Sequence, residues 1–342
     1  MAGVTEQIPA PTPALHDDAL PHRSGVAWHY GDPLGEQTLP RVAIDRRGMR
    51  SVAVAGPDAR SYLHSLFTQK LDDAVYGTQT ELLNLDAQGH VLEHAYVTVL
   101  DDEILLTTEA AETARLQEYL ERMKFWNDVT ITARDTGIVT LLGSGDPVAE
   151  TRALADIAQG AGIVRPVLGQ DRPRVDILVD DAFTPLPPAG LLTFEAHRVM
   201  SLEPVVGVDT DEKTIPHEHP QWIGSAVHLD KGCYRGQETV ARVHNVGRSP
   251  RVLVRLHVDG SAPQLPTTGT PITSGGRTVG RLGTIVHHHQ WGPVALGTIK
   301  RSALGASLQA GDAALAIDPD TLPAEGAPQA GKLAQQRLRH PR

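Results

Sequence analysis

One cysteine lies in a short segment that also carries two cations. Cys233 is the only cysteine among 342 residues, and Lys231 and Arg235 stand two positions before and after it. A thiol reacts as its thiolate, and neighbouring positive charges lower the pKa of the thiol. The stretch from Thr239 to Val243 is expected to begin a helix, whose N-terminal partial charge would act in the same direction. The segment therefore predicts a reactive cysteine with a thiol pKa below the usual value of about 8.5.

The same cysteine has a second interpretation, which the segment alone leaves open. A lone free cysteine is commonly a small buried hydrophobic residue. A single thiol excludes an intramolecular disulfide and any all-cysteine metal or iron-sulfur site within one copy of the chain. His217 and His219 lack the four-residue spacing that aligns two ligands on a helix, and the histidines at 287–289 would alternate across a strand. We therefore predict no stably bound metal, and a reducing cytoplasm as the compartment.

Composition and charge are those of an ordinary globular protein. Hydrophobic residues make up 40% of the chain and charged residues 21%, and the formal net charge is -10. Binding to nucleic-acid phosphates would work against this charge, so direct nucleic-acid binding is not expected. Residues 1–24 contain no continuous apolar stretch, which disfavours a signal or membrane anchor. Both this segment and residues 321–342 are predicted to be disordered tails.

The elements that must position the cysteine fall into three blocks. Residues 51–134 have the pattern of a strand, a helix, three strands, a helix and a strand, close to a ferredoxin-like unit. Residues 25–50 and 135–248 mix strands and helices, including a helix with Thr193 as its predicted cap. Residues 249–320 contain strands without helices, separated by glycine and proline clusters. This last pattern predicts a small β-barrel.

A resemblance to a known family adds to these predictions. The segment from Lys231 to Glu238 reads K-G-C-Y-R-G-Q-E and resembles the signature K-G-C-Y-x-G-Q-E of the YgfZ family. Members of this family are folate-binding proteins related to the aminomethyltransferase of the glycine cleavage system. An arginine-led stretch from Arg198 to Pro216 looks like the family's sequence before the signature. The resemblance runs from about residue 41 to about residue 300, and its specificity comes from the cysteine signature.

The resemblance implies an α+β fold, a three-domain aminomethyltransferase-like cloverleaf with a ferredoxin-like insert and a C-terminal β-barrel. Residues 25–50 plus 135–248 would form its discontinuous folate-binding domain. It also implies tetrahydrofolate or a derivative as the ligand, and a role in assembly or repair of iron-sulfur clusters in client enzymes, with cluster-assembly proteins as partners. Cys233, assisted by Lys231, is the implied reactive residue. The implied folate contacts are Arg198, Asp209, Glu93, Tyr234, Arg235, Gln237 and Glu238.

Two departures from the aminomethyltransferase pattern bear on catalysis. The pair Glu93-His94 stands where those enzymes carry Asp-Asp, and Ser201-Leu202 stands where the family has Ala-Gly. The longer glutamate stem would place its carboxylate differently, which weakens the case for one-carbon transfer. An accessory protein is therefore favoured over a tetrahydrofolate-dependent aminomethyltransferase-like enzyme or a non-catalytic folate-binding module. In a purely structural alternative, Arg198 pairs with a nearby acid such as Glu203 on the surface.

Overall fold

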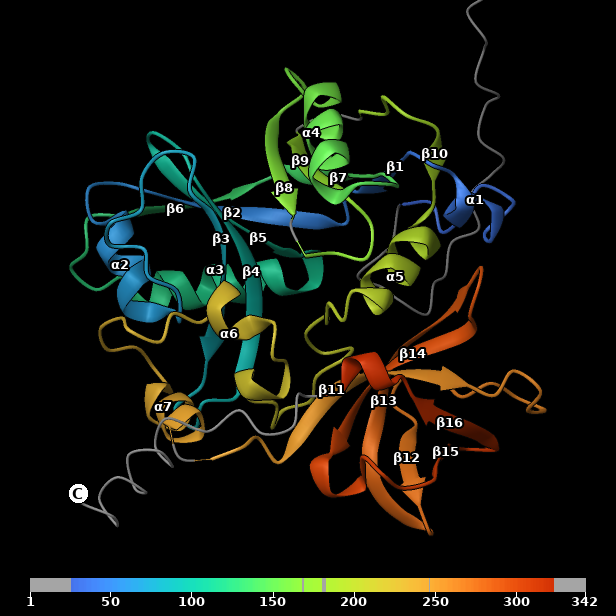
Figure 1. The fold of residues 1–342 in the computed structure, drawn as a ribbon. Coiled ribbons are helices and arrows are strands. Elements are labelled where there is room, and N and C mark those ends of the chain that lie inside the picture. Colours follow the sequence, from blue (N-terminus) through green and yellow to red (C-terminus); the bar gives the residue numbers. More distant parts are fainter. Residues whose placement is uncertain (1–25, 168, 180–182, 246, 323–342) are drawn as a thin grey trace, which may run out of the picture. The chain divides into compact units, whose positions relative to one another are not determined.

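The computed structural model describes residues 26–167, 169–179, 183–245 and 247–322 (Figure 1). The predicted tails lie outside these residues, apart from Thr321 and Leu322, which are described at the end of the chain. The chain divides into two compact units. Unit 1 contains Met1–Arg50, Glu109–Ala111 and Asp135–Ser201, and unit 2 contains Ser51–Thr108, Glu112–Arg134 and Leu202–Arg342.

Unit 1 is built on a five-stranded sheet with the order β10-β1-β7-β9-β8. Its strands are β1 (Val42–Arg46), β7 (Gly137–Leu142), β8 (Ile163–Val167), β9 (Arg174–Val179) and β10 (Pro188–Ala189). Its helices are α1 (Gly35–Thr38), α4 (Pro147–Ile157) and α5 (Leu191–Met200). Helix α4 packs on β8 and β9, and α5 packs on β1, so their apolar faces cover the sheet.

The starts of the two longer helices in unit 1 follow from local hydrogen bonding. Asp146 caps α4, because its carboxylate accepts the N–H groups of Val148 and Ala149 at 3.1 and 2.8 Å. The predicted cap of α5 at Thr193 is wrong, since the helix already begins at Leu191. The N–H of Gly190 donates to the Glu36 carboxylate at 2.8 Å, and this bond fixes the chain before the helix.

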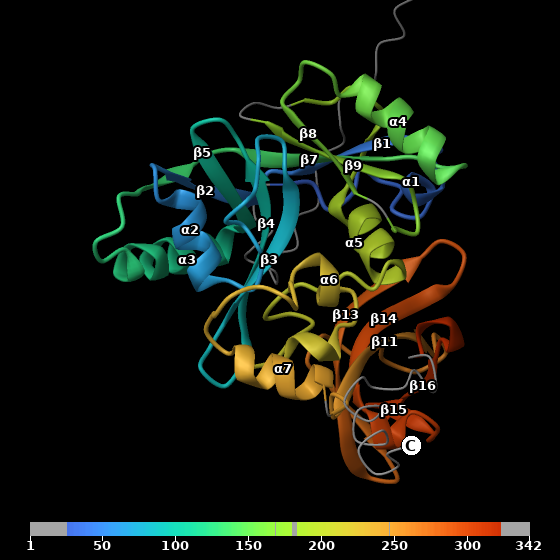
Figure 2. The same ribbon diagram turned by 60° about the vertical axis from the view of Figure 1, so that its left-hand side comes forward.

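The first part of unit 2 carries a second five-stranded sheet, with the order β3-β4-β5-β2-β6. Its strands are β2 (Met49–Ala55), β3 (Gln79–Leu85), β4 (Val91–Val99), β5 (Glu103–Glu109) and β6 (Thr130–Arg134). Helices α2 (Ala59–Leu66) and α3 (Ala110–Met123) lie on the same face of this sheet (Figures 1 and 2). The order of elements agrees with the predicted strand, helix, three strands, helix and strand.

Short elements follow in unit 2 before the barrel. They are the 3₁₀ turn η2 (Pro216–Glu218) and the helices α6 (Trp222–Ser225) and α7 (Gln237–Asn245). The buried Trp222, Val227 and Val240 pack against Leu83 and Val91 of the neighbouring sheet. This cluster holds the segment that contains Cys233 against β3 and β4.

The C-terminal part of unit 2 is a closed barrel with the order β11-β14-β13-β12-β15-β16. The strands are β11 (Arg251–Val258), β12 (Pro271–Ser274), β13 (Arg277–His288), β14 (Gly292–Lys300), β15 (Leu308–Ala310) and β16 (Ala313–Ile317), with 3₁₀ turns η3 (Arg301–Ala303) and η4 (Pro319–Thr321). The predicted barrel is confirmed. In β13 and the turn after it His288 is buried while His287 and His289 are exposed, as strand alternation predicts.

Within the described ranges, the structure contains no helix with both the length and the apolar character needed to cross a membrane.

Candidate functional site

Cys233 lies on the loop between α6 and α7, and its side chain is exposed. The predicted accessibility is confirmed, and the interpretation as a buried hydrophobic residue is wrong. Gly236 in the same loop has a φ of 82°. A Cβ at this position would lie 2.7 Å from the carbonyl oxygen of Asp86 and 2.9 Å from Cα of Gly89. Glycine is therefore needed here, because the cysteine loop is pressed against the turn between β3 and β4.

Lys231 anchors the other side of this loop. Its Nζ donates hydrogen bonds to the carbonyl oxygens of His64 and Phe67 at the C-terminal end of α2. Burial lowers the pKa of Lys231 to about 8. The same ammonium lies 4.9 Å from the ring centroid of Tyr234. Lys231 therefore connects the cysteine loop to α2, and its influence on Cys233 stays a prediction.

His64 is a neighbour of the cysteine loop that the sequence did not indicate. A Cβ placed at Gly232 would lie 3.6 Å from Nε2 of His64. Nδ1 of His64 lies 3.3 Å from the carboxylate of Asp72. Burial and the charge of Lys231 lower the pKa of His64, which keeps this imidazole neutral at pH 7. A neutral ring therefore faces the residue directly before Cys233.

A cavity of about 1020 Å³ opens in unit 2, and Arg235 of the cysteine loop forms part of its wall. Its other walls come from the start of β4, the inner face of α3, the loop at 206–213 and β13. The lining residues are Asn84, Asp86, Val91, Leu92, Glu93, Glu112, Arg115, Glu118, Tyr119, Arg122, Val206, Gly207, Thr210, Asp211, Glu212, Lys213, Arg235 and Arg281. The cavity is thus polar and carries charges of both signs.

Glu93 is a fixed carboxylate in the wall of this cavity. It lies on β4 with 2% of its surface exposed. Its Oε2 accepts a hydrogen bond from Nδ2 of Asn84 at 2.6 Å, and its Oε1 accepts one from Nε of Arg115 at 2.5 Å. The next residue, His94, contacts Glu81, with 3.0 Å between Nε2 and Oε2. Of the pair Glu93-His94, only Glu93 lines the cavity.

The other predicted contacts in unit 2 lie outside the lining of this cavity. Asp209 uses both carboxylate oxygens on backbone N–H groups, those of Val205 at 2.8 Å and Thr284 at 2.6 Å, and so joins the preceding loop to β13. Tyr234 and Gln237 contact each other, since Oε1 of Gln237 accepts the Tyr234 N–H at 3.2 Å. Glu238 is exposed in the first turn of α7. Of the predicted folate contacts, the structure thus brings Glu93 and Arg235 together.

Arg198 belongs to unit 1, whereas Glu93 and Asp209 belong to unit 2. Its guanidinium is 1% exposed, so the alternative of a surface arginine is wrong. Arg198 pairs with Glu195 one helical turn earlier on α5, with 2.5 Å between Nη2 and Oε2. The carboxylate of Glu203 accepts a hydrogen bond from the Tyr96 hydroxyl at 2.5 Å.

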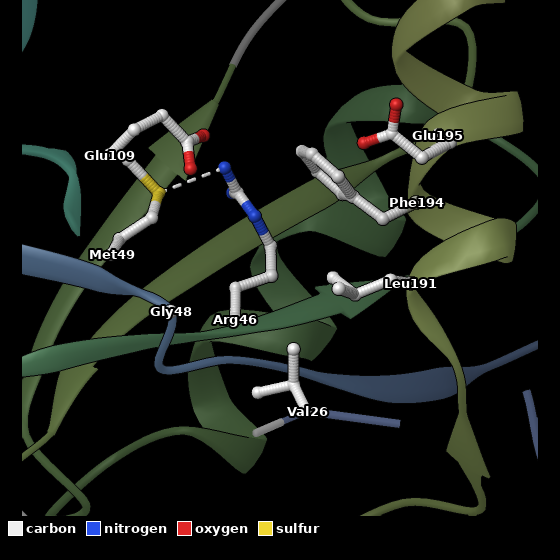
Figure 3. A pocket seen from close by; sticks show the side chains of 8 residues that line it. All are labelled: Val26, Arg46, Gly48, Met49, Glu109, Leu191, Phe194 and Glu195. Atoms are coloured by element: carbon white, nitrogen blue, oxygen red, sulfur yellow. Dashed lines mark hydrogen bonds between the residues drawn. The ribbon is translucent and has the colours of Figure 1, made fainter. Parts of the chain in front are cut away.

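Unit 1 contains a cluster of buried charged side chains around Asp176. Burial alone would raise the pKa of Asp176, but the guanidiniums of Arg174, Arg165 and Arg46 hold it well below its usual range. Arg46 lies 3.7 Å from the ring centroid of Phe194 and beside a cavity of about 20 Å³ (Figure 3). A space of this size holds at most a single water molecule. This cluster therefore stabilises the sheet of unit 1 and offers no ligand pocket.

Comparison with known proteins agrees with this architecture. Residues 251–324 match the family model described as CAF17, C-terminal beta-barrel domain. The iron-sulfur cluster assembly factor IBA57 homolog, mitochondrial, of Pyricularia oryzae is 29% identical over 216 residues, which cover 59% of this chain and 53% of the relative. This chain therefore spans about half the length of that relative.

Two further relatives match over longer stretches. The human iron-sulfur cluster assembly factor IBA57, mitochondrial, is 25% identical over 315 residues, covering 79% of this chain and 86% of the relative. The tRNA-modifying protein YgfZ of Edwardsiella ictaluri is 27% identical over 255 residues, covering 68% and 76%. The barrel match and these relatives support the similarity of this chain to YgfZ and IBA57 proteins. The predicted resemblance to YgfZ proteins is thereby confirmed for the chain, and the role of the K-G-C-Y-R-G-Q-E segment stays a prediction.

A solved structure supports the predicted fold of this chain. The crystal structure of glycine cleavage system aminomethyltransferase T from Bartonella henselae superposes with a TM-score of 0.71 at 16% identity. The superposition covers 87% of this chain and 91% of that protein. The aminomethyltransferase-like α+β fold is therefore confirmed.

Proposed function

We propose that this chain is a folate-binding accessory protein that supports the assembly or repair of iron-sulfur clusters in client enzymes. The observation that carries the proposal is an exposed, solitary thiol on a loop that also forms part of the wall of a large polar cavity. Relatives named as iron-sulfur cluster assembly factors and as a tRNA-modifying protein support it. The partners are then cluster-dependent enzymes and cluster-assembly proteins.

In the proposed reaction, Cys233 exchanges with a sulfur of the partner. The Cys233 thiolate attacks one sulfur of a partner disulfide or persulfide, a new S–S bond forms, and the displaced sulfur leaves with the electron pair of the broken bond. An exposed side chain on a loop suits such an encounter, because a protein-sized partner must reach the sulfur. A reducing compartment such as the cytoplasm would keep the thiol free between encounters.

The residues of the cavity fit a reduced folate. Ligand pockets commonly measure about 300–1,000 Å³, and this cavity reaches about 1020 Å³. A pterin ring presents N–H donors that a fixed carboxylate such as Glu93 can accept, and the glutamate tail is an anion that suits arginine. Bound tetrahydrofolate would supply a reduced pterin and a carrier for one-carbon groups. Glu93 and Arg235 would then orient it from two sides of the cavity.

Activity of cluster-dependent enzymes in cells separates the three functions considered for this chain. An accessory role for Cys233 predicts that Cys233→Ala abolishes the support given to those enzymes, whereas Glu93→Gln keeps part of it. The aminomethyltransferase-like alternative predicts the reverse, with Glu93 essential and Cys233 dispensable. The non-catalytic folate-binding module predicts that Cys233→Ala has no effect, and that only substitutions that weaken folate binding, with Arg198→Ala as the one implied by the resemblance, reduce the support. Full activity of the client enzymes with Cys233→Ala would therefore overturn the proposal.

Folate binding is tested separately on the purified protein. Isothermal titration calorimetry with tetrahydrofolate should detect binding to the wild type and weaker binding to Glu93→Gln. The same titration of Arg198→Ala tests the residue that the family resemblance implies. Equal affinity of the wild type and Arg198→Ala would remove Arg198 from the binding site, and no binding to the wild type would remove folate from the proposed function.

A further inference from the structure

Four of the six acids in the wall of the cavity are in contact with basic side chains of the protein. Glu93 and Glu112 both contact Arg115, at 2.5 and 3.5 Å. Hydrogen bonds from Arg251 hold the pKa of Asp211 well below its usual range, and Asp86 lies 2.8 Å from Nδ1 of His90.

Four cations of the same wall lie outside these contacts. Glu118 and Glu212 are exposed and remain as carboxylates, against the side chains of Arg122, Arg235, Arg281 and Lys213. Neither Arg122 nor Arg235 forms an ion pair with a carboxylate in the described part of the chain. The whole wall carries six carboxylates and five cations, so the unpaired positive charge is local to Arg122 and Arg235.

Two of these cations converge on one phenol. The guanidinium carbon of Arg122 lies 5.7 Å from the ring centroid of Tyr119, one turn earlier on α3. Burial raises the pKa of Tyr119, while the charge of Arg235 and a hydrogen bond from its guanidinium act in the opposite direction. Residues of α3 and of the cysteine loop thus meet at the same point of the wall.

The hydroxyl of Tyr119 has an unused hydrogen-bonding capacity. The residue is 5% exposed and lines the cavity; Arg235 donates toward its hydroxyl oxygen, but the O–H itself has no acceptor within the ranges that the structure describes. A buried polar group without a partner costs about 1–3 kcal/mol. An acceptor on a ligand would remove this cost, and the two neighbouring guanidiniums favour an acceptor that carries negative charge.

We propose that Tyr119, Arg122 and Arg235 form an oxyanion subsite that binds a carboxylate or phosphate group of the ligand in this cavity. The inference rests on the proposed function only for the identity of that ligand. If the ligand is a reduced folate, the carboxylates of its glutamate tail are the groups that the subsite binds. Arg235 occupies the variable position of the cysteine signature, two residues after Cys233. A ligand bound in the subsite would therefore hold, through Arg235, the loop that carries Cys233.

Calorimetry with four ligands tests the subsite. The ligands are tetrahydrofolate, its triglutamate, tetrahydropteroate (which lacks the glutamate) and inorganic phosphate. We expect Tyr119→Phe and Arg122→Gln to weaken tetrahydrofolate and triglutamate binding about 5- to 50-fold, and to leave tetrahydropteroate binding unchanged. Arg152→Gln is the matched control, because Arg152 is an exposed arginine of α4 that does not line the cavity.

Unfolding of the free protein separates a binding role from a structural one. Because the Tyr119 O–H has no acceptor and the exposed Arg235 can donate to water instead, Tyr119→Phe should unfold at about the same urea concentration as the wild type. Lower stability of this variant would show that the hydroxyl serves the fold and would contradict the inference.

The outcomes distinguish the subsite from the proposed function. Equal binding of tetrahydrofolate to the wild type, Tyr119→Phe and Arg122→Gln would overturn the subsite and leave folate binding in place. Phosphate binding that both variants lose, without folate binding to the wild type, would support the subsite and overturn the folate part of the function. No binding of any of the four ligands to the wild type would overturn both.

Discussion

Nε of Arg115 lies 2.5 Å from Oε1 of Glu93, and this ion pair joins helix α3 to the strand β4. The two side chains differ in environment, with 57% of the arginine side chain exposed and 3% of the glutamate. Water can therefore replace the carboxylate as a partner of Arg115. If the guanidinium were removed, Glu93 would keep its hydrogen bond from Asn84 as its remaining partner within the described residues.

We expect Arg115→Met to lower the free energy of unfolding by about 1–3 kcal/mol, because it leaves a buried carboxylate poorly compensated. Combining it with Glu93→Gln should cost clearly less than the sum of the two single substitutions. Urea unfolding of the four proteins in this double-mutant cycle measures the difference. Strict additivity would show that the two residues do not stabilise each other.

Leu202 adopts a backbone conformation that suits glycine, with a φ of 56°. At most positions a protein with alanine is more stable than one with glycine. In a left-handed backbone conformation this order is reversed, because a Cβ atom costs about 1 kcal/mol there. We therefore expect Leu202→Gly to be more stable than Leu202→Ala by about 1 kcal/mol. Chemical denaturation of the two variants is the test, and a more stable Leu202→Ala would contradict it.

His219 makes the stability of the fold sensitive to acid. The ring is completely buried, and burial lowers its pKa to about 3 from the usual 6.5. In the unfolded chain this histidine binds a proton near pH 6.5, whereas in the folded chain it stays neutral down to about pH 3. The free energy of unfolding is therefore undiminished by this group above pH 6.5 and decreases as the pH falls from 6.5 toward 3. Burial and His244 lower the pKa of His217 to about 4, which adds to the effect.

We expect the free energy of unfolding to fall by a few kcal/mol, on the order of 2–5, between pH 7 and pH 4. His219→Leu should flatten this dependence, while His287→Leu, which replaces an exposed histidine of β13, should leave it unchanged. Urea unfolding at a series of pH values gives the slope. An unchanged slope in His219→Leu would show that this ring takes no part.

The purified protein alone should not hold a stable iron-sulfur cluster. Clusters are fixed by four thiolates, or by two thiolates and two imidazoles, and each chain contributes only Cys233. Anaerobic reconstitution followed by iron and sulfide analysis and visible absorption is the measurement. A cluster that persists at stoichiometric occupancy through gel filtration and is absent from Cys233→Ala would make this chain a cluster carrier.

The longer elements could be predicted from the sequence, because they follow simple patterns. The strands β11, β13 and β14 are β-branched runs of seven or more residues between glycines and prolines. The short strands β12, β15 and β16 were not predicted, since three to five residues give too little alternation to recognise. The start of α5 was placed too late because Thr193 is a common cap, whereas a hydrogen bond from Gly190 to the distant Glu36 decides the start.

Only those residues of the candidate site could be predicted that stand out in the sequence, by a rare residue type or by the family resemblance. Cys233 and its cations are recognisable at once, and Glu93 through the family resemblance. Tyr119 and Arg122 were missed, because polar residues spaced along α3 look like the solvent face of an amphipathic helix. His64 was missed for the same reason on α2. Only the packing of the cysteine loop and α3 in three dimensions brings these residues to the site.

The exposed position of Cys233 has a consequence for turnover. A redox protein with two neighbouring thiols can release a bound partner by closing its own disulfide, but this chain has no second cysteine that could act as the resolving thiol. A mixed disulfide at Cys233 therefore persists until a thiol from another molecule attacks it. The lifetime of such a complex is then set by the surrounding thiol pool, and a supply of small reducing thiols would govern how often each molecule can be used again.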